Sequence, residues 1–386
     1  MRRLMTILLV AALAAGALWT LGRRREPAVE PGGMSVSQAL GGVPQTGFAR
    51  AVAPRAFRFP ADHGPHPEYK TEWWYFTGNL ADSAGRRFGY QLTFFRMALA
   101  PGEPPRSSRW ATNQAYMAHF ALTDVNGRRF SSAERFSRAA LGLAGAGGVP
   151  LEVFLEDWSA RETKGAPWSV RLRAAQGSGA LDLELVSAQP VVLNGERGLS
   201  RKGPEPGNAS YYYSIPRLAT RGTLSVGGER FQVTGTSWLD REWSTSALSG
   251  DQAGWDWFAL QLKDGRDLMY YQLRKKDGSA DPFSAGTLVA ADGSAKPLTR
   301  DQVRLVPTGW WKSPHDGARY PAGWRLSVPG EGIALEVVPR LSDQELLTSF
   351  RYWEGAVAVK GEGGAELGSG YLEMTGYQPG GAGVGR

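Results

Sequence analysis

The sequence predicts an all-β protein made of two tandem antiparallel β-barrels, and three observations support this fold class. The chain has 386 residues, which is too long for one ordinary domain and suits two. Its 50 glycines and 24 prolines imply many turns and favour strands over long helices. The second half of the chain also repeats the pattern of the first. We therefore expect one closed sheet in each half, because closure removes exposed strand edges.

The repeat is carried by aromatic segments that recur in the same order. Trp73-Trp74-Tyr75-Phe76, followed by Tyr90-Gln91-Leu92, is echoed by Trp255-Asp256-Trp257-Phe258, followed by Tyr271-Gln272-Leu273. Later matches keep this order: Trp168 with Trp324, Leu183 with Leu335, Tyr213 with Tyr352, and Val233 with Met374. Collinear matches over most of the chain indicate an internal duplication.

Short segments of alternating polarity, separated by turn residues, are expected to form hairpins. The run 88–95 is one such segment, and Asn126-Gly127 and Asp277-Gly278 are typical turn pairs. We place the N-terminal barrel at 55–236 and the C-terminal barrel at 237–378. A flexible linker at 26–54 precedes them, a flexible tail at 379–386 follows, and a short helix is expected at 343–350.

Residues 1–25 are expected to be a signal peptide or an N-terminal membrane anchor. Arg2 and Arg3 precede an apolar run at 4–21, and Arg23-Arg24-Arg25 follows it. The run is long enough to span a bilayer, so cleavage and retention both stay open. The sequence predicts an exported protein, periplasmic or otherwise extracytoplasmic, with residues 4–21 as the alternative anchor in the inner membrane.

Composition narrows the classes of partner. The net charge is +7, but five arginines around the leader supply much of it and the other basic residues are scattered among acids, so no nucleic-acid partner is expected. The chain has no cysteine, which excludes disulfides and thiol nucleophiles. Its 14 tryptophans can fill a core or line a pocket for flat apolar molecules. An apolar small molecule is therefore the expected ligand.

The first chemically distinctive segment is Glu72-Trp73-Trp74-Tyr75-Phe76. On a strand, Trp73 and Tyr75 share one face, while Glu72 and Trp74 share the other. A carboxyl group among indole rings has its pKa raised by desolvation and can donate a proton near neutral pH. Glu72 is therefore a candidate catalytic acid, and Trp73, Trp74 and Tyr75 are candidate ligand-binding residues. The alternative is that Glu72 pairs with an arginine at the barrel end.

The second distinctive segment is 237–243, with 254–257 shortly after it. Alternation places Asp240 and Glu242 on one face of a strand and Arg241 and Trp243 on the other. Asp240 and Glu242 are candidate catalytic residues. The expected ligand-binding residues here are Arg241, Trp243, Trp255 and Trp257. The alternative is a cluster of salt bridges that holds the two barrels together, because charges are costly to bury without partners.

Motifs for metals and cofactors are not evident. The four histidines, His63, His66, His119 and His315, show no spacing typical of a zinc or iron site. No glycine-rich phosphate loop, dinucleotide fingerprint or nucleophile elbow occurs. The sequence therefore predicts neither a metal nor a cofactor.

The segments 72–78, 237–243, 254–262 and 352–355 together resemble the carotenoid 1,2-hydratase and secreted lipocalin-like (AttH-type) family. The resemblance covers about residues 57–377 and implies two lipocalin-like barrels. It also implies, for the hydratase branch, addition of water to a terminal alkene of an acyclic carotenoid, with a general acid that protonates the double bond.

The hydratase branch looks to carry a His-Asp-His-Asn-Trp stretch, where this chain has 239–243 and keeps Asp240 and Trp243. Leu239 and Arg241 replace both histidines. A tyrosine and an aspartate two residues apart are also expected, where Tyr270 and Gln272 stand; both join the candidate ligand-binding residues.

These departures favour binding over hydration. The leading hypothesis is an exported protein that binds an apolar lipid, isoprenoid or polyketide-like ligand. Two alternatives stay open: a cofactor-free hydratase or isomerase of an isoprenoid or carotenoid-like substrate, and a structural accessory of an ABC-type transport system in the membrane.

Overall fold

The computed structural model describes residues 46–103, 107–163, 165–246 and 248–379. The predicted leader at 1–25 lies outside the described residues, as do most of the predicted linker and tail. Within the described part, no helix is long and apolar enough to cross a membrane. The helical turns there are short 3-10 segments: η1 (Ala61–His63), η2 (Arg300–Gln302), η3 (Pro329–Glu331) and η4 (Glu362–Gly364).

The first sheet is built from the N-terminal half and is antiparallel throughout. Its strands are β1 (Thr71–Ala81), β2 (Arg87–Ala98), β3 (Gln114–Asp124), β4 (Arg129–Arg138), β5 (Ala144–Gly147), β6 (Glu152–Leu155), β7 (Trp158–Thr163), β8 (Ser169–Gln176), β9 (Gly179–Ser187), β10 (Val192–Leu193), β11 (Leu199–Arg201), β12 (Ala209–Val226) and β13 (Glu229–Ser244). They run in the order β4-β3-β2-β1-β13-β12-β9-β8-β7-β6-β5, with β10 and β11 beside β12.

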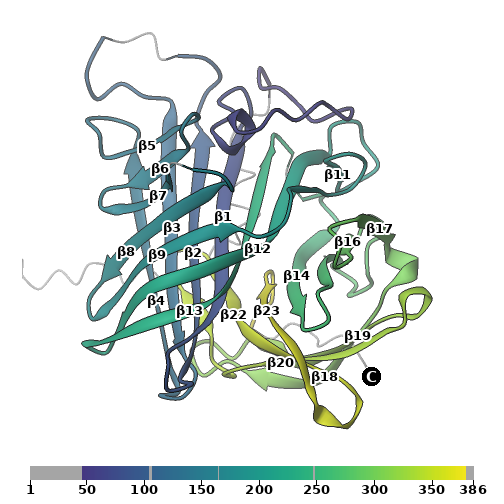
Figure 1. Ribbon diagram of the computed structural model, residues 1–386. Coiled ribbons are helices and arrows are strands. Elements are labelled where there is room, and N and C mark those ends of the chain that lie inside the picture. The colour runs from purple at the N-terminus through teal and green to yellow at the C-terminus, as the bar shows by residue number, and fades with distance from the viewer. Residues whose placement is uncertain (1–45, 104–106, 164, 247, 380–386) are drawn as a thin grey trace, which may run out of the picture. The chain divides into compact units, whose positions relative to one another are not determined.

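The second sheet is built from the C-terminal half (Figure 1). Its strands are β14 (Gln252–Leu262), β15 (Asp267–Lys275), β16 (Ala285–Val289), β17 (Ala295–Thr299), β18 (Arg304–Lys312), β19 (Arg319–Val328), β20 (Ile333–Pro339), β21 (Glu345–Leu347), β22 (Arg351–Lys360) and β23 (Glu366–Met374). They run in the order β17-β16-β15-β14-β23-β22-β20-β19-β18, with β21 beside β22.

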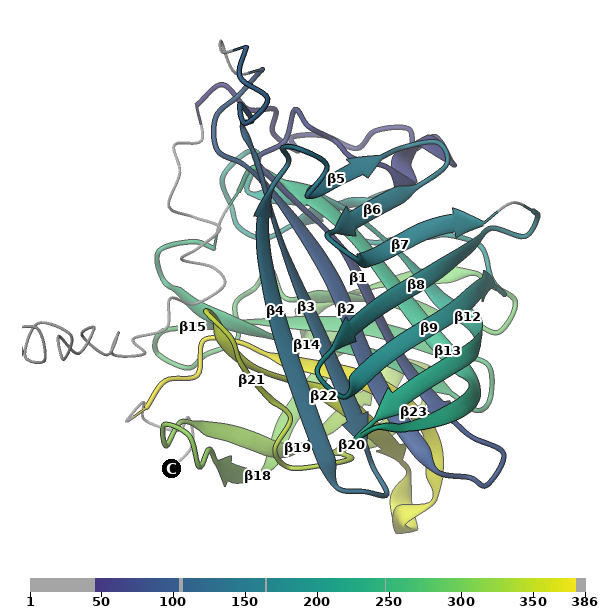
Figure 2. The same ribbon diagram turned by 90° about the vertical axis from the view of Figure 1, so that its left-hand side faces the viewer.

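Both sheets follow the same connection plan. Strands β1 to β4 are successive neighbours in the first sheet, and β14 to β17 are successive neighbours in the second. In the first sheet the last strand, β13, lies between β1 and β12. In the second sheet the last strand, β23, lies between β14 and β22. The first sheet curves until its edge strand β4 approaches β6 (Figure 2). The prediction of two tandem antiparallel barrels from an internal duplication is therefore confirmed.

Strand burial shows where the two sheets pack together. In β8 and β9 buried and exposed residues largely alternate, as expected for a sheet with one solvated face. In β1, β14 and the second half of β13, almost every residue is buried. One face of these strands points into its own barrel and the other packs against the opposite sheet. Both sheets lie in the same compact unit of the chain.

Side chains fill the interior of each barrel. The core of the first includes Trp74, Trp158 and Trp243, and the core of the second includes Phe258 and Trp353. A separate cluster, with Tyr75, Tyr212, Trp257 and Tyr271 among its members, combines residues of β1, β12 and β13 with residues of β14, β15, β22 and β23. The aromatic segments thus supply both the barrel cores and the contact between the barrels.

Polar groups also join the two sheets. The register of β12 with β13 shifts between Ile215 and Leu218, at Pro216, which has no N–H to give to the ladder. The Pro216 carbonyl accepts a hydrogen bond of 2.6 Å from Gln261 Nε2 in β14. Asn79 Nδ2 in β1 donates to the Gly370 carbonyl in β23 over 3.0 Å. These bonds hold the barrels in register with each other.

Two details differ from the sequence prediction. The helix expected at 343–350 is absent from this described segment, where β21 (Glu345–Leu347) pairs with β22 instead. This prediction was wrong because pairing with a neighbouring strand outweighs local helix propensity. The division placed after Thr236 falls inside β13, which continues the first sheet to Ser244.

Candidate functional site

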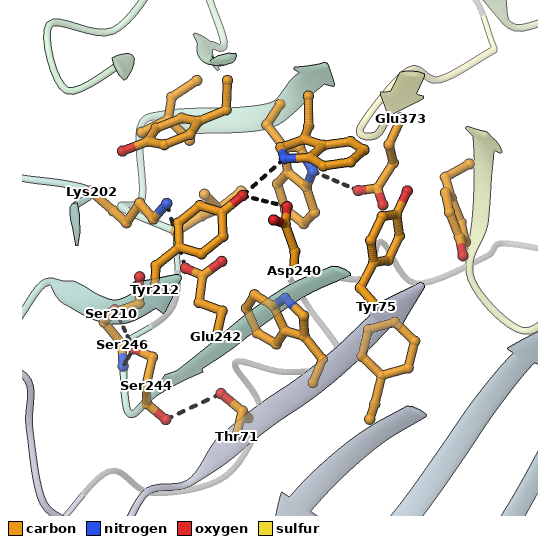
Figure 3. Close-up of a pocket in the computed structure, with 18 residues that line it drawn as sticks. Thr71, Tyr75, Lys202, Ser210, Tyr212, Asp240, Glu242, Ser244, Ser246 and Glu373 are labelled. Atoms are coloured by element: carbon orange, nitrogen blue, oxygen red, sulfur yellow. Dashed lines mark hydrogen bonds and ion pairs between the residues drawn. The ribbon is translucent and has the colours of Figure 1, made fainter. Parts of the chain in front are cut away.

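A pocket of about 150 Å³ lies where the two sheets meet (Figure 3). Its lining residues come from β1, β2, β12 and β13 of the first sheet and from β14, β15, β22 and β23 of the second. The wall is mostly aromatic, formed by Trp73, Tyr75, Phe95, Tyr212, Trp255, Trp257, Tyr271 and Tyr352. Asp240, Glu242, Glu373 and Lys202 add charged groups. The pocket therefore combines an apolar wall with several carboxyl groups.

Strand alternation determines which predicted residues reach the pocket. Trp73 and Tyr75 of β1 and Asp240 and Glu242 of β13 point toward it, as do Trp255 and Trp257 of β14. Their sequence neighbours Glu72, Trp74, Arg241 and Trp243 lie on the opposite face, inside the first barrel. Six of the residues predicted from sequence thus meet in one pocket, and those four lie away from it.

Asp240 is a buried residue of the pocket lining and accepts three hydrogen bonds. The Tyr212 hydroxyl and Ser214 Oγ each donate over 2.5 Å, and Trp238 Nε1 donates over 2.7 Å. Burial raises the pKa of Asp240 to about 7 and nearby Glu242 adds to the rise, although the three donors oppose it. Asp240 can therefore hold or release a proton near neutral pH.

Glu242 and Lys202 form an ion pair beside Asp240. Lys202 Nζ lies 3.5 Å from Glu242 Oε1 and 3.7 Å from the centre of the Tyr271 ring. Burial lowers the pKa of Lys202, but Glu242 and Tyr271 outweigh it, so that the net pKa of this ammonium is raised. This pair places the ammonium group of Lys202 next to the Glu242 carboxyl group in the pocket wall.

A second acidic pair comes from the C-terminal half. Glu354 and Glu373 face each other on β22 and β23, and Glu373 lines the pocket. Trp255 Nε1 donates to Glu373 over 2.6 Å, and the Tyr75 hydroxyl donates to Glu354. Burial and the proximity of Glu373 raise the pKa of Glu354 well above its ordinary value, and burial raises that of Glu373 to about 7. Because two adjacent buried carboxylates repel, the pair holds a proton at neutral pH.

We expect the substitution Glu354→Gln to change how stability depends on pH. The folded protein holds the Glu354 proton more tightly than the unfolded chain, so the wild type loses stability as the pH rises above about 4.5. Glutamine has no proton to lose. From about pH 5 to pH 8, the unfolding free energy of the wild type should fall by up to about 4 kcal/mol relative to that of the variant, since one proton corresponds to about 1.4 kcal/mol for each pH unit.

Urea denaturation at both pH values measures this change, with Glu362→Gln at an exposed position as the matched control. Parallel pH profiles for the wild type and Glu354→Gln would contradict the assignment of a proton to the Glu354–Glu373 pair.

Glu72 lies in an ion network inside the first barrel. Arg241 Nη2 donates to Glu72 Oε2 over 2.5 Å, Arg96 Nε donates to Glu72 Oε1, and the His66 backbone N–H donates as well. The Arg241 guanidinium stacks over the Trp74 ring at 3.9 Å. Although burial opposes it, the two guanidinium groups hold the pKa of Glu72 far below its usual range. This is the ion pair considered above as the alternative to a catalytic Glu72.

The remaining predicted residues belong to the interior of the second barrel. Tyr270 is part of its core. Gln272 lies opposite Asp256 on the neighbouring strand and donates a hydrogen bond to it. Asp256 also pairs with Arg274 at 3.0 Å and accepts from the Tyr377 hydroxyl over 2.9 Å. Arg241, Glu242 and Asp256 therefore pair within their own sheets, and no ion pair is found for Asp240 among the described residues. These residues do not form the salt-bridge cluster between the barrels that was considered above as the alternative.

Sequence reasoning missed several residues of the pocket. Lys202 and Tyr212 come from the segment around β11 and β12, and Glu373 comes from β23. The run Tyr211-Tyr212-Tyr213 could have indicated candidate ligand-binding residues, because the tryptophan-rich runs were chosen for the same aromatic pattern. Lys202 and Glu373 carry no local signal, because their role depends on contacts with residues far away in the chain.

The side chains of His315, Asp343 and Glu345 offer donor atoms within 4.8 Å of one another and could hold a metal ion. His315 lies in the β18–β19 loop and Asp343 before β21, so their spacing in the sequence does not reveal the group. Ser313 Oγ and the Tyr320 hydroxyl already donate to Glu345, over 2.5 and 3.0 Å. These bonds satisfy the buried carboxylate with protein donors.

Comparisons with known proteins agree with this architecture. The AttH protein of Nitrosomonas europaea is 38% identical, with a TM-score of 0.77 over 86% of this chain and 100% of its own. Kievitone hydratase from Nectria haematococca is 15% identical, with a TM-score of 0.62 over 86% of this chain and 96% of its own, and shares the fold. The curated proteins include no match.

The fold and the site together define a two-barrel, lipocalin-like protein with its pocket between the barrels. A family model described as AttH-like matches residues 50–377. This chain belongs to the AttH-like family.

Proposed function

We propose that this protein binds an apolar small molecule in the pocket between its barrels. The observation that carries the proposal is the aromatic wall, in which rings from both halves surround one space. Rings of this kind favour flat apolar molecules, and the few polar groups among them fix orientation. The barrel interiors are filled with side chains, which makes the space between the sheets the better place for a ligand.

The size of the pocket limits what it encloses. A volume of about 150 Å³ is similar to that of a cavity that holds benzene. A lipid, isoprenoid or polyketide-like ligand would place one end there and extend past the half-buried residues Trp73, Phe95 and Leu248. The pocket would therefore enclose the end group of such a ligand, and the rest of the molecule would lie outside it.

We expect Trp73→Ala to weaken ligand binding by about fivefold or more. The half-buried indole offers a contact face at the pocket, and each stacked ring contributes roughly 1 kcal/mol or more. Quenching of tryptophan fluorescence by aromatic and isoprenoid alcohols measures the affinity. Trp110→Ala, at a side chain 55% exposed, is the matched control and should bind as the wild type does. Equal affinities for both variants would place the ligand elsewhere.

The second candidate function is a cofactor-free hydratase or isomerase. Asp240 favours it, since a pKa of about 7 suits a group that gives and takes protons at neutral pH. The rings around it would stabilise a cation formed by protonation of an alkene. A likeness in fold to a protein named kievitone hydratase agrees with this chemistry. Incubation with a panel of prenylated and terpenoid alkenes, followed by mass spectrometry for a gain of one water, tests it; unchanged substrates across the panel would count against catalysis.

Export and a membrane partner form part of the same proposal. The apolar run at 4–21 directs the chain out of the cytoplasm, and the mass of the mature protein distinguishes a cleaved leader from a retained anchor. An ABC-type transport system is the candidate partner, and crosslinking in intact cells tests it. An intact N-terminus on a cytoplasmic protein would contradict export.

A further inference from the structure

Acidic groups outnumber basic ones around the pocket. Asp240, Glu242 and Glu373 line it, Glu354 is buried opposite Glu373 on the neighbouring strand, and among the described lining residues Lys202 is the one cation. Lys202 pairs with Glu242. No ion pair is found for Asp240 or Glu373 within the described chain. Two carboxyl groups therefore face an aromatic space without an ion-pair partner of their own among the described residues.

One positive charge, the ammonium group of Lys202, already lies in the pocket wall against aromatic rings and a carboxyl group. The Lys202 ammonium lies 3.7 Å from the centre of the Tyr271 ring and 5.3 Å from that of Tyr212, with the Glu242 carboxylate at 3.5 Å. Ring faces and a carboxylate together form the usual surroundings of a bound organic cation. Asp240 and Glu373 also line this aromatic pocket (Figure 3), and the Trp255 indole N–H donates to Glu373 over 2.6 Å.

We propose that the ligand carries a positively charged end group, an ammonium on an apolar body, which lies beside Asp240 and Glu373 against the indole rings. This inference rests on the proposed binding function and narrows its ligand class. A cation there would allow both acids to ionise, and a neutral group of the same shape would leave them protonated. The pocket should therefore distinguish two molecules of equal size by their charge.

The charge preference should also depend on pH. The pKa values of Asp240 and Glu373 are raised to about 7, so these groups are largely neutral at pH 6 and ionised at pH 8. The other titratable groups that face them are Glu242, Glu354, Lys202, Tyr75, Tyr212, Tyr271 and Tyr352. The pKa of Lys202 is raised by its neighbours, and burial raises the pKa values of Tyr75, Tyr212 and Tyr352 well above the ordinary value. These groups therefore keep their charge state in this range, and affinity for a cation should rise from pH 6 to pH 8.

Phenyltrimethylammonium and tert-butylbenzene test the inference, since they share one shape and differ in charge, and the quaternary ammonium is charged at every pH. Titration of the full chain, followed by tryptophan fluorescence, should show at least tenfold tighter binding of phenyltrimethylammonium at pH 8. The preference should shrink severalfold at pH 6, while tert-butylbenzene binds equally at both pH values.

The substitution Glu373→Gln should lower the affinity for phenyltrimethylammonium about tenfold and leave that for tert-butylbenzene unchanged, with Glu362→Gln as the exposed control. Equal or tighter binding of tert-butylbenzene by the wild type would overturn the charge inference and leave the binding function standing. If neither molecule binds the wild type, both proposals fail. The wild-type comparison decides the matter even if Glu373→Gln does not fold.

Discussion

The substitution Glu72→Gln is expected to lower the free energy of unfolding by about 3–5 kcal/mol, because it leaves two buried guanidinium groups without their carboxylate. Arg241 and Arg96 are at most 1% exposed, and both donate to Glu72. Glutamine keeps the shape of the side chain and removes the charge, so the effect reports the ion network rather than packing. Urea denaturation at pH 7 measures it.

The matched control is Glu184→Gln, which removes a surface pair with Arg221 in which the two side chains are 38% and 72% exposed. This change should cost at most about 1 kcal/mol. Because the pKa of Glu72 is depressed, its contribution is present above about pH 4.5 and is lost as the pH falls further. A deficit below about 1 kcal/mol for Glu72→Gln would show that the network adds little to stability.

The substitution Asp240→Asn is expected to reduce any turnover of an alkene substrate by about 10²–10⁴-fold, the usual range for loss of a general acid. Asparagine fills the same space but supplies no acidic proton. Because the pKa of Asp240 is about 7, wild-type activity should fall as the pH rises above about 7, where the acid is ionised. Initial rates from pH 5 to pH 9, measured as formation of the hydrated product, check both expectations.

Asp264→Asn serves as the control, because this aspartate pairs with Arg266 at the surface of the second barrel. Its rate should equal that of the wild type. Ligand affinity of Asp240→Asn, measured in parallel, separates a loss of chemistry from a loss of binding. Unchanged turnover in Asp240→Asn would remove this residue from the mechanism, and an unchanged pH profile would point to another acid.

Much of the fold could be predicted from the sequence because it follows from periodicity and repetition. Alternation along β1 and β13 correctly grouped Trp73 with Tyr75 and Asp240 with Glu242. Alternation alone cannot say which of the two faces meets a pocket when both are buried. For this reason Trp74 and Trp243, which lie in the barrel core, could not be distinguished from Trp73 before the sheets were placed.

The acidic groups of the C-terminal half could not be predicted from the sequence. Glu373 lies in a strand of ordinary composition, and its proximity to Asp240 depends on how β23 packs against the first sheet. The raised pKa of Glu354 likewise arises from a partner on the neighbouring strand. Effects of this kind depend on charges brought together across the fold, which no local pattern records.

The walls of the pocket come from both copies of the duplicated unit, and this limits which substitutions the protein can accept. Neither copy alone forms the complete pocket, and separating the copies would expose Trp257 and Tyr271 to water. The barrel interiors can therefore accept substitutions that preserve volume. A residue at the junction contacts both sheets, so a substitution there has to fit the packing of both. Small shifts of one copy against the other would change the shape of the pocket without any rebuilding of either barrel.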